Sequence, residues 1–282
     1  MVEVGRLATH GATGAGPTSP AVHMEHTLSA SHLTAQWDAA VKPRERFRRE
    51  CQAQPHAAAW LTAQPCEALG LLFAPADFQL LCRRWLGVNL FPSLEAALCP
   101  ACGGQGDVQG DHVLCCAQLG RYARHTALRE TLLRIAEAAG YSCQTEVRVD
   151  PASQRRPADF LITGFDHGVD LAVDVSGVHP LQLRSDFTQD CGAVAERREQ
   201  QSAAFCHAQG VRFTPVVGET TGGWGPLSHA FLRRLFRAYR SRHPSASAEE
   251  GTSALWCRVS VGFAKAVGRQ LASAVVLEDL DL

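Results

Sequence analysis

The sequence predicts a mixed α/β (α+β) fold, in which helices flank a mixed sheet, and two observations support this prediction. Between residues 121 and 242, helical and strand-like apolar patterns follow one another in the order α-β-β-β-α-β-α. Upstream of this region, cysteines and a histidine occur at spacings typical of a zinc site. We therefore expect a sheet domain preceded by a metal-binding module and a helical segment.

The composition is that of a folded intracellular protein. Hydrophobic residues make up 46% of the 282 residues, and the net charge of -1 gives no overall basic field for a nucleic acid. Eleven cysteines without an apolar secretory segment indicate a reducing compartment. No apolar run is long enough to span a bilayer, so we expect no membrane partner. Lys42 and Lys265 are the only lysines among 27 basic residues.

The first 98 residues divide into two parts. Residues 1–40 are rich in small and polar residues without periodicity, which predicts a disordered leader. Residues 41–98 show helical apolar spacing and form a predicted helical segment. Within this segment, Pro75 and Asp77 form a typical helix start.

Residues 99–120 carry the predicted zinc knuckle. Cys99 and Cys102 form a C-x2-C turn followed by two glycines, and His112 and a cysteine pair come next. This is a standard tetrahedral arrangement for zinc, and four protein ligands predict a structural ion. His112 and Cys116 share a helical face, so we prefer Cys116 as the fourth ligand and keep Cys115 as the alternative.

A helix and a strand follow the knuckle. The helix is predicted from Tyr122 to Ala139, with Gly140 as its cap, and the strand from Ser142 to Val149. His125 lies at the start of the helix, as a spare zinc ligand or as a packing residue.

The next two apolar runs flank a glycine-bounded loop, residues 164–168, and predict a β-hairpin. With the turn centred between Asp166 and His167, residues whose numbers sum to 333 pair, so Asp159 faces Asp174. Two carboxylates held together against their repulsion indicate a divalent cation between them. The alternative is that both are solvated residues near strand ends. The predicted core face of the hairpin consists of Phe160, Ile162, Leu171, Val173 and Val175.

The remaining elements complete the predicted order. We expect a helix from Asp186 to Gln209, a strand from Val211 to Val217 and a basic helix from Leu227 to Arg242. Pro215 indicates that this strand lies at a sheet edge or that the strand ends there. Residues 243–282 are predicted to form a linker up to Thr252, a helix near residues 254–273 and an acidic tail.

Taken together, these motifs resemble the C-terminal region of site-specific non-LTR retrotransposon polyproteins, in which a CCHC knuckle precedes a restriction-like endonuclease of the PD-(D/E)XK fold. The resemblance extends roughly from Trp60 to Ala274, without a reverse-transcriptase core, which implies a detached or truncated piece of an element. It rests on Cys99-x2-Cys102…His112-x3-Cys116, Arg121 to Arg129, Arg156-Pro157-Ala158-Asp159…Asp174-Val175-Ser176 and Glu219-Thr-x-Gly-Gly-Trp224.

The resemblance implies a nuclear DNA endonuclease that uses catalytic Mg²⁺, held by Asp159 and Asp174, beside a structural Zn²⁺. RNA is an alternative partner. The family's lysine is missing, because Ser176 stands at one of its positions and the following helix offers only residues such as Arg197 and Gln200. The alternative function is a nucleic-acid-binding remnant with a decayed site, and a third is a relic without activity. Candidate phosphate contacts are Arg121, Arg124, Arg156, Arg233 and Arg237.

Overall fold

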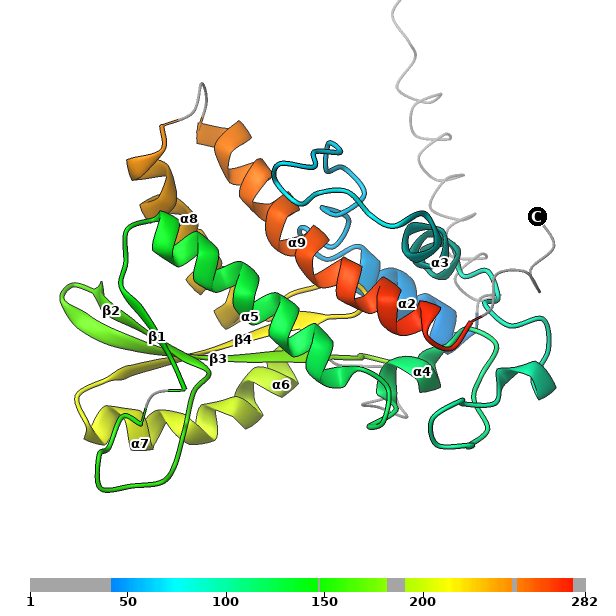
Figure 1. Cartoon of the computed structure of the whole chain (residues 1–282), viewed down its shortest axis with the longest axis horizontal. Coiled ribbons are helices and arrows are strands. Elements are labelled where there is room, and N and C mark those ends of the chain that lie inside the picture. Colours follow the sequence, from blue (N-terminus) through cyan, green and yellow to red (C-terminus); the bar gives the residue numbers. More distant parts are fainter. Residues whose placement is uncertain (1–41, 147, 182–190, 245–247, 276–282) are drawn as a thin grey trace, which may run out of the picture. The chain divides into compact units, whose positions relative to one another are not determined.

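The computed structural model describes residues 42–146, 148–181, 191–244 and 248–275 (Figure 1). The predicted leader, the acidic tail beyond residue 275 and the start of the helix predicted from Asp186 lie outside these residues. None of the described helices is both long and apolar enough to cross a membrane.

A four-stranded mixed sheet forms the centre of the domain, with strand order β1-β2-β3-β4. Its strands are β1 (Cys143–Thr145), β2 (Phe160–Asp166), β3 (Val169–Val178) and β4 (Arg212–Glu219). The first three strands are antiparallel, and β4 runs parallel to β3 at the edge, where its Pro215 was expected. The mixed α/β class and the element order from residue 121 to 242 are therefore confirmed, although β1 is shorter than the strand predicted over Ser142–Val149.

The β2–β3 hairpin has the predicted register, but it reaches that register by a different route. The turn is centred on His167 and Gly168, whose positive φ values of 57° and 88° are typical of a tight hairpin turn. This centre lies one residue later than predicted. A bulge between Ile162 and Asp166 shifts the pairing back, so that Phe160 pairs with Val173 as expected.

Helices cover both faces of the sheet (Figure 1). On one face lie α5 (Arg121–Ala138), α8 (Pro226–Arg242) and α9 (Ala248–Ala272), and the strand residues predicted to face the core pack with them. On the other face lie α6 (Cys191–Glu199), the 3₁₀ turn η2 (Gln200–Ser202) and α7 (Ala203–Ala208), where Cys206 packs on Leu161 and Ala172. The long helix predicted up to Gln209 is thus interrupted by η2.

The N-terminal segment packs around α9. It contains α2 (Pro43–Gln52), α3 (Pro75–Leu86), η1 (Glu95–Ala97) and α4 (Asp111–Cys115). Asp77 is buried in the first turn of α3, as its position after Pro75 predicted. Helix α9 begins at Ala248, inside the stretch predicted as a linker, because alanine and glutamate at that point favour a helix.

The turn after β4, which carries the motif from Glu219 to Trp224, packs against the N-terminal segment. Glu219 is fully buried and its carboxylate accepts hydrogen bonds from the Gly192 N–H (2.8 Å) and the Thr221 hydroxyl (3.1 Å). Gly222 has a φ of 93° and lies against the backbone of Ala57, where a side chain would clash with the carbonyl oxygen. The motif from Glu219 to Trp224 therefore joins the sheet to the N-terminal segment.

Candidate functional site

Four side chains converge in the predicted knuckle: Cys99, Cys102, His112 and Cys116. Their potential ligand atoms all lie within 4.8 Å of one another. The Cys99 and Cys116 sulfurs are 3.7 Å apart, and the Cys102 sulfur is 3.3 Å from Nε2 of His112. Zinc–sulfur bonds of about 2.3 Å at tetrahedral angles would separate two sulfurs by about 3.8 Å. The cluster can therefore bind a metal ion such as zinc.

The structure brings Cys116, and not Cys115, into this cluster. The Cys116 N–H donates to the His112 carbonyl at 2.7 Å, which is the four-residue helical spacing on which the prediction rested. Cys115 turns inward instead, and burial raises the pKa of its thiol to about 12, although the nearby Arg124 and Arg84 oppose this shift.

The environment of Cys99 favours the thiolate that a metal requires. Burial alone would raise the pKa of this thiol, but the backbone N–H groups of Cys102 and Ala101 outweigh it. The Cys102 thiol and His112 act in the same direction, and the pKa of Cys99 falls to about 6. A deprotonated sulfur at neutral pH is the form that coordinates zinc.

Asp107 positions the histidine of the cluster, and the sequence analysis missed it. Its carboxylate accepts the N–H groups of Asp111 (3.1 Å) and His112 (2.8 Å) at the start of α4. These bonds satisfy two of the amides that a helix start leaves unpaired. The available signal was an aspartate a few residues before a short helix, in the manner of a capping residue.

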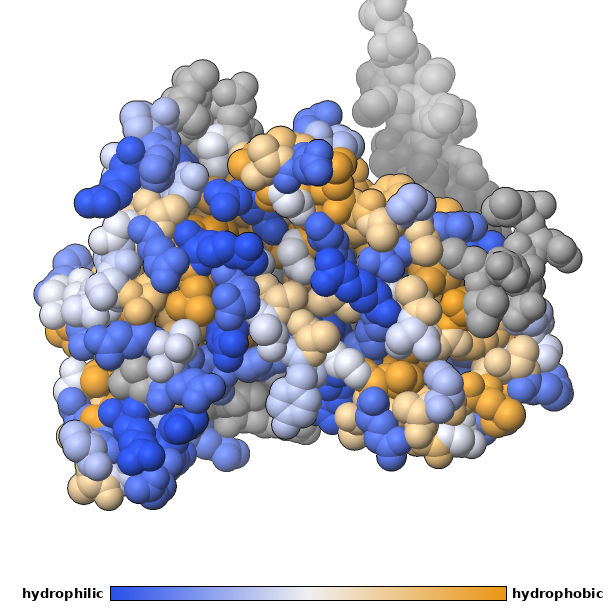
Figure 2. Space-filling view, viewed as in Figure 1, coloured by the Kyte–Doolittle hydropathy of each residue, from blue (hydrophilic) through white to orange (hydrophobic). Residues whose placement is uncertain are grey.

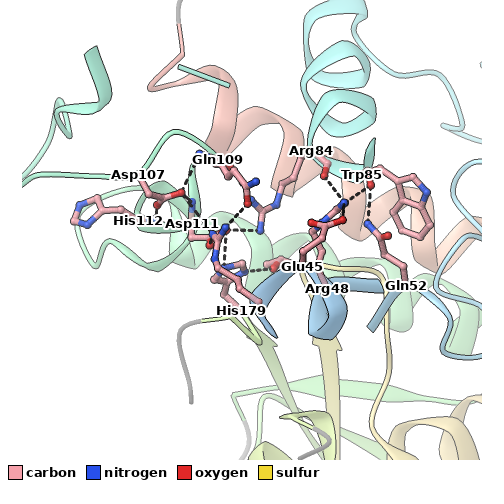
Figure 3. Close-up of polar contacts among 12 residues, drawn as sticks. Glu45, Arg48, Gln52, Arg84, Trp85, Asp107, Gln109, Asp111, His112 and His179 are labelled. Atoms are coloured by element: carbon pink, nitrogen blue, oxygen red, sulfur yellow. Dashed lines mark hydrogen bonds and ion pairs between the residues drawn. The ribbon is translucent and has the colours of Figure 1, made fainter. Parts of the chain in front are cut away.

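A buried ionic network centred on Asp111 joins the cluster to the rest of the domain (Figure 3). The Asp111 carboxylate contacts Arg44 from α2, Arg84 from α3 at 2.8 Å and His179 at 3.2 Å. His179 follows β3, and its Nδ1 lies 2.6 Å from the Thr220 hydroxyl after β4. Because Asp111 immediately precedes His112, this network ties a potential metal ligand to the ends of β3 and β4 and to two N-terminal helices.

Arg48 stabilises the same region by capping the C-terminus of α3 (Figure 3). Its guanidinium donates to the carbonyls of Arg84 (3.1 Å) and Trp85, and Gln52 donates to the second of these at 2.9 Å. Helix carbonyls at a C-terminus lack partners within the helix, so these bonds hold α2 against α3.

The second candidate site lies where β2 begins, beside the C-terminal half of β3. Asp159 precedes β2, and its carboxylate accepts the Val175 N–H at 2.7 Å. Phe160 pairs with Val173, and the Asp159 N–H donates to the Val173 carbonyl at 3.0 Å, so the predicted pairing of Asp159 with Asp174 stays a prediction. Asp174 lies on the same face of the sheet as Ala172, the face that α7 covers. Burial raises the pKa of the Cys206 thiol to about 11, and the negative charge of Asp174 acts in the same direction.

His125 contacts Asp159, which neither sequence-based alternative anticipated. Its Nε2 lies 2.9 Å from both carboxylate oxygens, with 29% of the histidine side chain and 17% of the aspartate side chain exposed. An open cavity begins at this pair, and its lining consists of Ala117, Arg121, Tyr122, His125, Ser176 and Gly177. The cavity therefore joins the first turns of α5, the end of β3 and the segment after the metal cluster.

The other predicted catalytic residues do not reach this point. Arg197 is exposed on α6 and Gln200 lies in η2, and no contact between described residues joins either one to Asp159. Among the described residues, the Cys/His cluster is also the one group of three or more potential ligands that converges, so Asp159 and Asp174 form at most a pair. Mg²⁺ commonly uses one or two carboxylates and several waters, so a pair of acids still fits this ion chemically.

The predicted phosphate contacts fall into two groups. Arg121, Arg233 and Arg237 are exposed, and so is Arg156, which pairs with Glu146 at 2.5 Å. Arg124 is 2% exposed, so its prediction as a surface contact is corrected. It lies one helical turn before Leu128 on the inward face of α5, and burial lowers its pKa to about 10.

A basic groove between α5 and α9 was also missed. Hydrophilic side chains gather over these helices in Figure 2, and the groove is lined by Arg134, Arg258, Lys265 and Arg269, with Glu130 as its one acid. The signal was present in the sequence, since residues 258, 265 and 269 are spaced to share one helical face.

Comparison with known proteins adds no assignment, because no protein-family model and no curated protein matches the chain.

Proposed function

We propose that residues 121–242 form a metal-dependent DNA endonuclease domain of the restriction-like type, similar to those of site-specific non-LTR retrotransposons. The adjoining Cys/His cluster would hold a structural zinc ion. The mixed sheet supports this proposal, because helix, three antiparallel strands, helix and parallel strand follow one another in the order predicted from the sequence around the two aspartates.

One observation carries the proposal. Asp159 lies directly before β2 and Asp174 lies in the neighbouring strand β3, and an open cavity lined by His125 begins next to Asp159. Carboxylates on neighbouring strands repel one another, and we propose that a bound cation compensates their charge. The cavity beside them gives a phosphodiester access to the sheet edge.

The residues at this edge have distinct proposed roles. Asp159 and Asp174 would hold Mg²⁺, which supplies an activated water and stabilises charge on the phosphate oxygens. Asp159 is already oriented by the Val175 N–H. Arg121, at the cavity wall, would contact a phosphate, and the α5–α9 groove would bind the backbone further along. Arg197 and Gln200 remain proposed substitutes for the lysine.

A second candidate function is a nucleic-acid-binding module that has lost catalysis. The observation that favours it is the absence of lysine from β3, α6 and η2, where Ser176 in β3 and Gln200 in η2 stand at the positions that the resemblance assigns to lysine. Arg233 and Arg237 would then share phosphate binding with Arg121. This alternative keeps the fold and the zinc site and differs only in the chemical step.

A plasmid-nicking assay separates the two candidates. The full chain, loaded with zinc, is incubated with supercoiled DNA and Mg²⁺ or Mn²⁺, with EDTA as the metal-free arm. Asp159→Asn and Asp174→Asn keep the size of each side chain and remove its charge, and Asp150→Asn in the loop before β2 is the matched control. We expect nicking by the parent and the control only.

Each result has a definite consequence. Nicking that survives in both site variants would show that the activity lies elsewhere and would refute the proposal. Equal DNA binding by all proteins, with no nicking by any, would favour the binding module. Circular dichroism and zinc content establish that each variant has folded before its activity is compared.

A further inference from the structure

The contact between His125 and Asp159 suggests a role for a residue that the resemblance leaves unassigned. Nε2 of His125 lies 2.9 Å from each oxygen of the carboxylate. The two side chains come from separate elements, α5 and the segment before β2; His125 lines the cavity, and 17% of the Asp159 side chain is exposed. An imidazole nitrogen and a carboxylate therefore share one accessible point.

The spacing of these atoms matches two ligands of one ion. Octahedral ions with bonds of about 2.1 Å separate neighbouring ligand atoms by about 3.0 Å, close to the observed nitrogen–oxygen distance. Oδ2 of Asp159 also accepts the Val175 N–H, so the backbone of β3 fixes the carboxylate. The pair is thus held in place by the fold and needs no large movement to receive an ion.

We infer that His125 is a ligand of the metal ion at Asp159, and that it shifts the site's preference from Mg²⁺ toward Mn²⁺. This inference rests on the proposed function. Waters complete the coordination shell.

The chemistry of the donors sets this preference. Mg²⁺ is bound almost entirely through oxygen, whereas nitrogen ligands add affinity for first-row transition ions. Mn²⁺ also accepts carboxylates, so it suits a histidine with one or two aspartates. In the tautomer that carries its hydrogen on Nε2, the His125 ring would donate a hydrogen bond to Asp159 in the absence of metal. When the ion binds, that proton moves to Nδ1 through solvent and the lone pair of Nε2 faces the metal.

The alternative is that His125 only orients Asp159 by hydrogen bonding. His125→Gln distinguishes the two roles, because a glutamine amide can still donate to the carboxylate but is a weak ligand for Mn²⁺. His207, an exposed histidine on α7, gives the matched control His207→Gln. Asp159→Asn removes the charged ligand common to both roles.

The experiment measures metal binding and needs no nuclease activity. Zinc-loaded full-length chain is titrated with Mn²⁺, and free Mn²⁺ is followed by its electron paramagnetic resonance signal. Mg²⁺ affinity is obtained by competition. We expect His125→Gln to weaken Mn²⁺ binding at least tenfold with less than a threefold change for Mg²⁺, His207→Gln to bind as the parent does, and Asp159→Asn to lose both ions.

Several outcomes would overturn the inference. Equal Mn²⁺ affinity in the parent and His125→Gln would reduce His125 to a positioning residue and leave the proposed metal site intact. An absence of Mn²⁺ and Mg²⁺ binding by the parent would remove the proposed metal site as well. Pulsed resonance of the parent gives a check that needs no variant, since coordinated imidazole produces nitrogen modulation and its absence would also refute the inference.

Discussion

Removing the carboxylate of Asp111 should destabilise the whole domain. Asp111→Ala leaves Arg84 buried, with 9% of its side chain exposed, and takes away its closest carboxylate. It also removes the partner of Arg44 and of the His179 ring. The expected loss is therefore the cost of a buried positive charge without a compensating carboxylate, and it should affect α2, α3 and the ends of β3 and β4 together.

The magnitude follows from the burial of Arg84. Burial lowers the pKa of this guanidinium from 12.5 to about 10, so keeping it charged costs about 3 kcal/mol even with Asp111 present. Breaking one side of a buried ion pair typically costs about 3 to 5 kcal/mol. Asp111 is slightly exposed and Asp107 lies near Arg84, so we expect about 3 kcal/mol.

Urea unfolding followed by tryptophan fluorescence measures this loss. All proteins are zinc-loaded, and zinc content is checked because Asp111 adjoins His112. Glu67→Ala, at an exposed position, is the control and should change the free energy of unfolding by less than about 0.5 kcal/mol. The double variant Asp111→Leu with Arg84→Met should recover part of the loss. A loss below about 1 kcal/mol in Asp111→Ala would refute the reasoning.

Three further predictions concern the metal cluster, the turn after β4 and pH. Cys116→Ser should abolish zinc binding and Cys115→Ser should preserve it, as measured by the zinc content of the purified proteins; equal losses would contradict the ligand assignment. Gly222→Ala should cost more than about 2 kcal/mol in urea unfolding, because it adds a backbone clash to a positive φ. Gly70→Ala has a similar φ and open space, so it should cost about 1 kcal/mol, and equal costs would argue against the clash. Burial, with nearby arginines, holds the pKa of His179 well below 6.5. The unfolded chain therefore takes up this proton first, and the free energy of unfolding should fall as pH drops below about 6.5. His179→Gln should flatten that slope between pH 7 and 5, and an unchanged slope would disprove the assignment.

Local patterns in the sequence were sufficient for the elements and for the Cys/His cluster. Helix α5 carries buried leucine and isoleucine residues at helical spacing, and the potential ligands of the cluster lie within 18 residues of one another, so local spacing was enough to predict both. The pairing of Phe160 with Val173 was also predicted, although the bulge near Gly164 compensated for a turn placed one residue too early. Period-2 alternation fixed the buried face and so constrained the register.

Contacts between distant segments could not be obtained in this way. The partners of Asp111 come from α2, α3 and the end of β3, and no periodicity relates these positions. His125 and Asp159 are likewise 34 residues apart, and their contact depends on how α5 crosses the sheet. Arg124 was assigned to the surface by its charge alone, whereas its place on the helix puts it inside.

Helix α9 has a consequence for the order in which the chain can fold during synthesis. It is the last described element, yet it packs on α3 and α5, and Gln270 donates to the Val113 carbonyl of α4 at 2.7 Å. The apolar faces of α3 and of the segment around the Cys/His cluster therefore stay exposed to solvent until about 150 later residues have left the ribosome. Binding of the proposed zinc ion would need only local closure of the Cys/His cluster, so it could come first and protect this segment from misassembly.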